Sequence, residues 1–162
     1  MSIRFYEVNT DYIDYLSRHE KHLFRNSKPN QRNTRKYVGI VVTVHELNYF
    51  IPLSSYKPKH NRMREMVDFL KIRDYAVLNI NNMLPVPEGF YTPLNFAKIK
   101  DKRYQQLLQA EYRIIKSRQE LIRKNAKIVY NRKTDPNDHS ALSKRCNNFL
   151  LLERLAKSYQ AK

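Results

Sequence analysis

Near residue 100 the hydrophobic pattern of the chain changes from one typical of strands to one typical of helices. Between Asp101 and Tyr130, apolar pairs recur every seven residues: Leu107/Leu108, Ile114/Ile115, Leu121/Ile122 and Ile128/Val129. This spacing predicts one long amphipathic helix. A seven-residue repeat also occurs in coiled coils. Doubled apolar positions, however, make a stripe wide enough to cover a sheet, so we expect the helix to pack on one.

Ahead of this helix, short runs of β-branched and aromatic residues indicate strands. The polar pair His45–Glu46 separates two such runs, which is the signature of a hairpin. Pro85 and Pro87 are expected to end the last run or to place it at a sheet edge. The expected elements are a strand at 2–8, a helix at 10–24 capped by Asn9 or Thr10, hairpin strands at 37–44 and 47–53, and strands at 65–72 and 75–87.

Behind the long helix, Ser140 or Ser143 is expected to cap a last helix, and His139 reads as a loop or cap residue. Strands come first along the chain and helices later, so the predicted fold class is α+β with an antiparallel sheet. A chain of 162 residues without internal repeats is expected to form a single domain over 1–162.

The charge of the chain is its strongest hint of function. The sequence has 31 Lys and Arg residues against 15 Asp and Glu, for a net charge of +16. Self-repulsion of this size disfavours a compact state, which points to a polyanionic partner, with nucleic acid as the first candidate. An anionic membrane surface is the second candidate, but no apolar run has the length of a membrane span. The N-terminus has no signal-peptide apolar block, so we expect a cytoplasmic protein.

Several kinds of chemistry find little support in the sequence. The lone Cys146 excludes an internal disulfide, and its apolar neighbours indicate a buried thiol. His19 and His22 have the spacing of two metal ligands on a helix, but no third ligand lies near, so we expect no metal site. The two glycines, Gly39 and Gly89, leave no glycine-rich phosphate loop, and we expect no nucleotide cofactor.

The segment from Phe50 to Met63, FIPLSSYKPKHNRM, concentrates hydroxyl, ammonium and imidazole groups behind a hydrophobic run. One interpretation is an ordinary solvated basic turn. The other is a ribonuclease site, because RNA carries its own nucleophile, the 2′-hydroxyl. Such an enzyme needs a proton acceptor, donors for the phosphoryl oxygens and an acid for the leaving oxygen. Serines and lysines can supply the donors, and His60 is the loop group that exchanges protons near neutral pH. The scattered carboxylates argue against a two-metal nuclease.

The IPLSSYKPKH stretch behind the YVGIVV…YFIPL hairpin resembles the toxins of type III toxin–antitoxin systems, the ToxN/AbiQ family of endoribonucleases. The similarity extends to RFYEVNTDYIDYL, AVLNINNMLPVP, the basic helix and CNNFLLLERLAKSY, so it spans nearly the whole chain. It implies a compact, strongly curved antiparallel sheet flanked by helices, similar to the Kid/MazF-type toxin fold. It also implies metal-independent RNA cleavage in phage defence by abortive infection, leaving 2′,3′-cyclic phosphate and 5′-hydroxyl ends.

The resemblance further implies an RNA partner: a small structured antitoxin RNA, a pseudoknot, that the toxin cuts from a repeat array and then holds in a closed protein–RNA assembly. Cellular and phage RNA would be the substrates. The implied catalytic groups are Ser55, its neighbour Ser54, Lys57, and a basic residue before the 37–44 strand, where Arg35 and Lys36 are the alternatives. The family's tyrosine a few residues upstream is missing from PNQRNT.

Tyr56 occupies a position that is commonly proline in the family, and it either stacks on a base or covers the loop. Tyr91 is a second candidate for stacking. The expected RNA-binding residues are Tyr56, Lys59, Arg62 and Arg64 of the serine–lysine loop, Lys28 and Arg32 of the 25–36 loop, and Arg123, Lys124 and Lys127 of the long helix. The alternative to an endoribonuclease toxin is a non-catalytic RNA- or DNA-binding regulatory protein.

Overall fold

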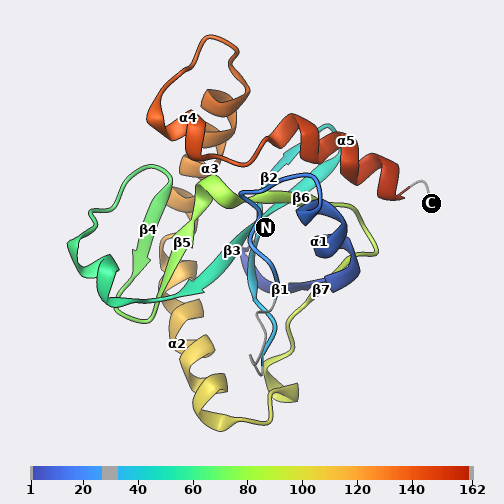
Figure 1. The fold of residues 1–162 in the computed structure, drawn as a ribbon. Coiled ribbons are helices and arrows are strands. Elements are labelled where there is room, and N and C mark those ends of the chain that lie inside the picture. The colour runs from blue at the N-terminus through green and yellow to red at the C-terminus, as the bar shows by residue number, and fades with distance from the viewer. Residues whose placement is uncertain (1, 27–32, 161–162) are drawn as a thin grey trace.

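The computed structural model describes residues 2–26 and 33–160. Strands fill most of the first half of the chain, and helices fill most of the second half (Figure 1). The elements in chain order are β1 (Arg4–Val8), α1 (Thr10–Ser17), β2 (Tyr37–Val44), β3 (Leu47–Ser55), η1 (Pro58–Arg62), β4 (Phe69–Ile72), β5 (Ala76–Asn79), η2 (Ile80–Asn82), β6 (Leu84–Val86), β7 (Tyr91–Pro93), η3 (Phe96–Lys98), α2 (Lys102–Ser117), α3 (Gln119–Thr134), α4 (Ala141–Arg145) and α5 (Phe149–Gln160).

Within residues 2–26 and 33–160, seven strands form one antiparallel sheet in the order β4-β5-β3-β2-β1-β7, with β6 paired to β3. The predicted α+β class with an antiparallel sheet is therefore confirmed. β3 is the central strand, because it pairs with β2, β5 and β6 along different parts of its length. The prolines place β6 where it pairs with a single strand, as expected for a strand that contains Pro85.

The hairpin predicted around His45–Glu46 is present as β2 and β3. Both turn residues have positive φ, 50° for His45 and 67° for Glu46, as a two-residue hairpin turn requires. Further along β2, a Cβ atom at Gly39 would collide with the ring of Phe50. Gly39 is thus fixed by the close approach of an aromatic ring on the neighbouring strand.

The sheet is apolar on both faces, and each face is covered by different helices (Figure 1). Phe5, Val38 and Ile51 pack with Leu108, Ile115 and Ile122 of α2 and α3. On the other face, side chains of α1 and α5 pack with strand residues that alternate with the first set: Tyr6, Tyr37 and Phe50. Burial on both faces explains why the strands read as nearly continuous hydrophobic runs.

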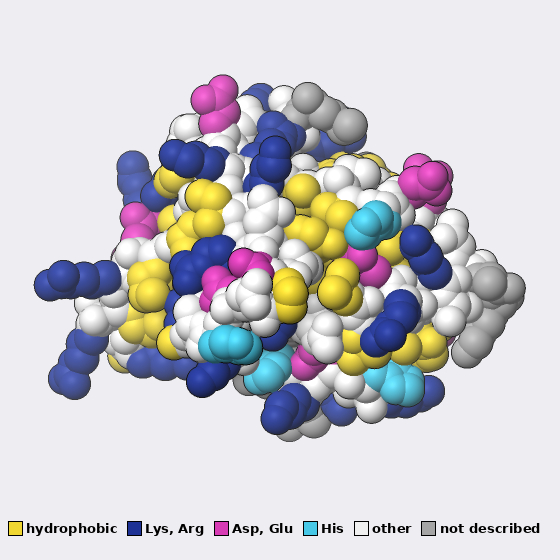
Figure 2. Space-filling view, turned by 90° about the horizontal axis from the view of Figure 1, so that it is seen from above, with side chains coloured by type: hydrophobic (Ala, Val, Ile, Leu, Met, Phe, Trp, Pro, Cys, Tyr) yellow, Lys and Arg dark blue, Asp and Glu magenta, His cyan; other side chains and the backbone are white. Residues whose placement is uncertain are grey.

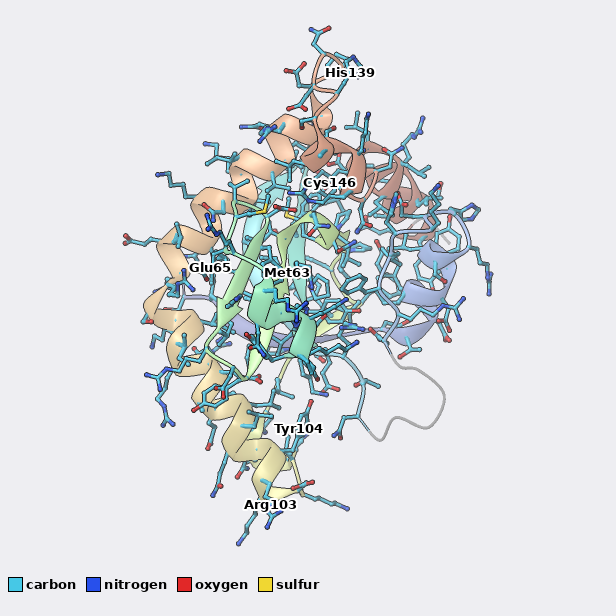
Figure 3. All side chains as sticks on the ribbon, turned by 60° about the vertical axis from the view of Figure 1, so that its left-hand side comes forward. Met63, Glu65, Arg103, Tyr104, His139 and Cys146 are labelled. Carbon is cyan, nitrogen blue, oxygen red and sulfur yellow. The ribbon has the colours of Figure 1, made fainter. Side chains whose placement is uncertain are left out.

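The long helix predicted from residue 101 onwards is present but bent. Asp101 caps α2 by accepting hydrogen bonds from the backbone N–H groups of Arg103 and Tyr104. At Arg118 the backbone leaves helical geometry, with φ −108° and ψ 13°, and α3 begins in a new direction. The Arg118 guanidinium donates to Glu65, 2.8 Å away, and to the carbonyl of Lys71, 3.0 Å away. Glu65 lies beside the bend in Figure 3, so the sheet side of the molecule holds the bend in place.

Two of the predicted helices are shorter than expected. The helix expected over 10–24 ends at Ser17, and the last helix is divided into α4 and α5. Ser140, one of the two expected caps, does cap α4 by accepting from the Ser143 N–H. The 75–87 strand is likewise divided into β5 and β6.

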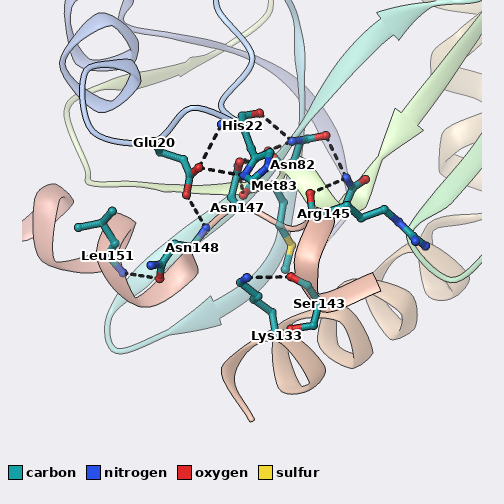
Figure 4. Close-up of polar contacts among 11 residues, drawn as sticks. Glu20, His22, Asn82, Met83, Lys133, Ser143, Arg145, Asn147, Asn148 and Leu151 are labelled. Carbon is teal, nitrogen blue, oxygen red and sulfur yellow. Dashed lines mark hydrogen bonds and ion pairs between the residues drawn. The ribbon is translucent and has the colours of Figure 1, made fainter. Parts of the chain in front are cut away.

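Polar contacts between distant segments explain these interruptions (Figure 4). The Glu20 carboxylate accepts from the backbone N–H of His22 at 3.0 Å and from that of Asn148 at 2.7 Å. The fully buried Asn147 side chain donates to the carbonyls of Asn82 and Met83, 3.0 and 3.1 Å away. These bonds satisfy backbone groups that a continued helix or strand would otherwise use.

Cys146, His19 and His22, the reactive side chains considered for a thiol or metal site, make structural contacts. Cys146 is buried, and burial raises the pKa of its thiol to about 12, in agreement with the predicted core thiol. The ring of His22 contacts Glu20, and His19 packs on Tyr15. Over 2–26 and 33–160, no three His, Cys, Asp or Glu side chains come together as a metal site would require. In the same residues, no helix has the length and apolarity to cross a membrane.

Candidate active site

A cavity of about 320 Å³ opens where the end of β3 meets the first half of α2. It is lined by segments that are far apart in the sequence: 33–36 before β2, the end of β3 with Lys57, the turn before β5, and α2. The lining residues are Asn33, Thr34, Arg35, Lys36, Leu53, Ser54, Ser55, Lys57, Tyr75, Ala76, Tyr104, Leu107, Leu108 and Glu111. Five of the six predicted catalytic residues are therefore brought to one place.

The strand β3 sets the positions of the two serines. Its pairing with β2 reaches only to Pro52, and from Leu53 onwards it pairs with β5, with Ser54 opposite Val77 and Ser55 opposite Ala76. This exchange of partners places both hydroxyl-bearing residues at the end of β3, where they line the cavity. Ser54 is half-buried and Ser55 is exposed at the cavity.

Arg35 is held rigidly beside Ser54. Its Nη1 donates to the Leu53 carbonyl at 2.9 Å and to the Ser54 Oγ at 3.0 Å. Its Nε donates to the Arg25 carbonyl at 2.9 Å, and its guanidinium lies over the Phe24 ring. Burial lowers the pKa of Arg35, but an arginine stays protonated in proteins. Arg35 thus supplies a fixed positive charge that orients a serine hydroxyl.

Lys36 is the more buried of the two alternative basic residues. Its Nζ donates to the Thr34 carbonyl at 3.1 Å and lies 3.6 Å from the Glu7 carboxylate. The same ammonium lies over the Tyr104 ring, 5.9 Å from its centroid. Figure 3 shows Tyr104 near the start of α2, at the opposite end of the molecule from His139. Arg35 and Lys36 both line the cavity, so both side chains can contact the same bound molecule.

Lys57 and His60 hold each other through the backbone. The Lys57 N–H donates to Nδ1 of His60 at 2.8 Å, and the His60 N–H donates to the Lys57 carbonyl at 2.9 Å. The His60 ring is only 6% exposed and lies between Tyr56 and Phe69. Burial, followed by the nearby Lys59, lowers the pKa of His60. Unlike Lys57, His60 is not among the residues that line the cavity.

The predicted RNA-binding residues are spread more widely than the catalytic ones. Tyr56 donates its hydroxyl to Asn61 at 2.8 Å and packs against His60. The exposed side chains of Lys59, Arg62 and Arg64 follow in the same loop. Lys124 and Lys127 are exposed on α3, with Arg123 half-buried beside them, whereas Lys28 and Arg32 lie outside the described residues.

Tyr91, the second candidate for base stacking, belongs to the packing of the sheet. Its ring is half-buried and lies 4.7 Å from the Phe50 ring and 5.6 Å from the Tyr6 ring, measured between centroids. Its hydroxyl accepts from Asn48 at 3.1 Å. These contacts are those of a cross-strand aromatic residue.

The half of the cavity formed by α2 and the β4–β5 turn was missed by the sequence reasoning. It is apolar and aromatic, with Tyr75, Tyr104, Leu107 and Leu108, and it contains one carboxylate, Glu111. Glu111 is 3% exposed, and its Oε2 atom has no hydrogen-bond partner among the described residues. A signal was present, because Glu111 follows Leu107 and Leu108 by one helical turn and so falls within the apolar stripe.

The cavity is therefore divided into two chemically different halves. One half offers three cations and two serine hydroxyls, the groups that bind and polarise a phosphate. The other half offers aromatic and aliphatic surface, on which a sugar or a base can lie. A single nucleotide with its phosphate has the corresponding division of polarity.

The family model for the toxin ToxN of type III toxin–antitoxin systems matches residues 4–157. The endoribonuclease AbiQ of Lactococcus lactis subsp. lactis is 32% identical over 174 aligned residues, which cover 100% of this chain and 92% of that protein. The endoribonuclease ToxN of Bacillus thuringiensis subsp. kurstaki is 28% identical over 131 residues, or 78% of this chain and 66% of that protein.

Two solved structures match over the full length of both chains. The lactococcal anti-phage endoribonuclease AbiQ superposes with a TM-score of 0.86 at 28% identity. A type III toxin that is selectively inhibited by a non-coding RNA pseudoknot superposes with a TM-score of 0.85 at 26% identity. Sequence and fold agree over the whole chain, and the protein is a member of the ToxN toxin family of type III toxin–antitoxin systems.

Proposed function

We propose that the protein is an endoribonuclease toxin that cuts RNA without a metal ion. In this reaction the 2′-hydroxyl attacks the adjacent phosphate and leaves 2′,3′-cyclic phosphate and 5′-hydroxyl ends. The observation that carries the proposal is the convergence of Arg35, Lys36, Lys57 and the two serines on one cavity. Fixed cations and hydroxyls there can neutralise the charge that grows on the phosphoryl oxygens, which is the work a metal ion does in other nucleases. The endoribonuclease names of the relatives support the same activity.

The residues have separate tasks in this proposal. Ser55, exposed at the cavity, donates its hydroxyl to a phosphoryl oxygen, and Ser54 is the second donor, oriented by Arg35. Lys36 binds the phosphate from the side of Tyr104. Lys57 is an exposed residue that also lines the cavity, and its ammonium group protonates the leaving 5′-oxygen.

His60 has a positioning task rather than proton transfer. Its Nδ1 is already occupied by the Lys57 N–H at 2.8 Å, and the ring is enclosed by Tyr56 and Phe69. Through these contacts it fixes the start of η1 and thereby the place of Lys57.

The proposed partner is a small structured antitoxin RNA, as in the solved toxin that an RNA pseudoknot inhibits. This RNA would be cut from a repeat precursor by the toxin and would remain bound with its cleaved end in the cavity. Cellular and phage RNA would be the substrates when the antitoxin is lost, by analogy with the anti-phage AbiQ.

The test uses the purified parent protein and the variants Ser55→Ala, Lys57→Ala and Lys157→Ala. Each protein is incubated with an end-labelled messenger transcript. Loss of one donor to the transition state is expected to slow cleavage roughly 10²–10³-fold for Ser55→Ala and Lys57→Ala. Lys157→Ala is the matched control, because Lys157 is an exposed lysine of α5 that neither lines the cavity nor belongs to the expected RNA-binding residues. Folding of each variant is checked by thermal melting.

A non-catalytic RNA-binding protein is the competing function, and the same experiment separates the two. Such a protein would bind the transcript without cutting it. Cleavage that survives in Ser55→Ala and Lys57→Ala at the parent rate would show that the active site lies elsewhere.

A further inference from the structure

Glu111 is the one carboxylate among the described residues that line the cavity. It comes from the middle of α2, and on that helix it stands between Leu108 and Ile115, both of which are buried. An acid in a buried apolar stripe normally has a cation or several hydrogen-bond donors to compensate for its lost hydration. Among the described residues, Glu111 has no such partner for Oε2. This is the arrangement of a group kept for chemistry rather than for stability.

The other titratable groups that line the cavity are basic or phenolic side chains. Arg35 and Lys36 come from the segment before β2, and Lys57 follows β3; all three are cationic. Tyr75, from the turn before β5, and Tyr104, from α2, are phenols, and burial raises the pKa of Tyr104 to about 12. The two serine hydroxyls of the cavity are weak proton acceptors. Burial raises the pKa of Glu111 to about 7, which suits a group that must exchange protons at neutral pH.

We propose that Glu111 is the general base of the RNA cleavage reaction and removes the proton from the attacking 2′-hydroxyl. The inference rests on the proposed function. As the proton passes to the Glu111 carboxylate, the 2′-oxygen forms its bond to phosphorus. The bond from phosphorus to the 5′-oxygen breaks, and that oxygen leaves with the electron pair and takes a proton from the Lys57 ammonium. Glu111 and Lys57 then return to their ionised states by exchange with water.

The division of the cavity supports this assignment. The phosphate is drawn to the cationic half, so the ribose lies toward α2, where Leu107 and Tyr104 offer apolar surface. The 2′-hydroxyl belongs to that ribose, and Glu111 is the acceptor on that side. In a site poor in water, a carboxylate without competing donors is a stronger base than the same group in solution.

The test compares the parent protein with Glu111→Gln and with Glu120→Gln, a control that makes the same change at an exposed position of α3. Single-turnover cleavage of the labelled transcript is measured from about pH 5.5 to 8.5, with RNA affinity measured separately by filter binding. The parent rate is expected to rise with pH up to about 7 and then level off, following the Glu111 pKa. Glu111→Gln is expected to lose roughly 10²–10⁴-fold in rate and its acid limb, with RNA affinity unchanged. Glu120→Gln is expected to behave as the parent.

A Glu111→Gln protein that cuts within about threefold of the parent rate, or that keeps the acid limb, overturns the inference. So does a variant that cuts slowly only because it binds RNA less well, since that result makes Glu111 a base-recognition residue. If Glu111→Gln does not fold, the pH profile of the parent decides, and a flat profile over the same range overturns the inference. A parent protein that does not cut RNA contradicts the proposed function instead, so the two failures are distinct.

Discussion

A buried carboxyl without a partner destabilises the fold that contains it. At Glu111, burial raises the pKa from the ordinary 4.5 to about 7. The folded protein therefore holds this proton more tightly than the unfolded chain does between those two pH values. Its stability falls as the pH rises through that interval and is constant above it. Active sites commonly accept such a loss where the same group serves the reaction.

Replacing Glu111 by Gln removes the ionisation and so should stabilise the protein at high pH. At pH 8 the free energy of unfolding is expected to rise by roughly 2–4 kcal/mol over the parent. At pH 5 most of this gain should be gone, because the parent carboxyl is then largely protonated when folded. Urea denaturation at both values measures the difference. An equal gain at the two pH values would show that packing, rather than charge, separates the variants.

At the scale of elements, the loop after β3 depends on one imidazole. The reciprocal bonds between Lys57 and His60 set the start of η1. His60→Ala is therefore expected to lower the cleavage rate by loosening Lys57. His60→Asn, whose side-chain oxygen can accept the Lys57 N–H, is expected to restore much of it. The pH profile should keep the same midpoint in both variants. A shifted or abolished limb would return the proton-transfer role to His60.

An element could be predicted from the sequence when the residues that determine it are close neighbours along the chain. The β2–β3 hairpin and the Asn9 cap of α1 arise from neighbouring residues, and both were anticipated. The end of α1 at Ser17 was not, because it depends on a bond between Glu20 and distant Asn148. The bend at Arg118 similarly depends on Glu65, which comes from another part of the chain.

The same reasoning applies to the candidate site. Ser54, Ser55 and Lys57 stand together in the sequence, so their pattern was visible there. Glu111 joins them only through the packing of α2 across the sheet, and on the helix it resembles a polar interruption of an apolar stripe. The enclosure of His60 also could not be foreseen, since Phe69 reaches it from β4.

At the scale of the whole molecule, the dominant feature is the net charge of +16. On the face shown in Figure 2, Lys and Arg side chains are more numerous than Asp and Glu side chains and lie mostly around its margin. Lys124 and Lys127 of α3 lie 13 and 16 residues beyond Glu111, or about 20 and 24 Å along the bent helix. A bound RNA that reaches both α3 and the cavity would therefore have separable affinity and cleavage contacts.

Binding of the antitoxin RNA should depend steeply on salt. About six phosphate contacts at a slope of roughly −0.7 each predict a roughly 300-fold loss of affinity between about 50 and 200 mM salt. Lys124→Ala and Lys127→Ala should each flatten the slope by less than about one unit and leave the single-turnover rate unchanged. Titration of the inactive Ser55→Ala protein with RNA across this range measures the slope. An affinity that does not change with salt would show that base and shape contacts dominate.

The identity of the cleaved ends tests the proposed chemistry most directly. Parent protein is incubated in EDTA with an all-ribose RNA and with the same RNA carrying a single 2′-deoxy nucleotide at the mapped cleavage site. The prediction is full activity on the first, with 2′,3′-cyclic phosphate and 5′-hydroxyl ends, and no cleavage of the second at that site. Cleavage at the deoxy position, products with 5′-phosphates, or activity lost in EDTA and restored by a divalent cation would contradict attack by the 2′-hydroxyl in a metal-independent site.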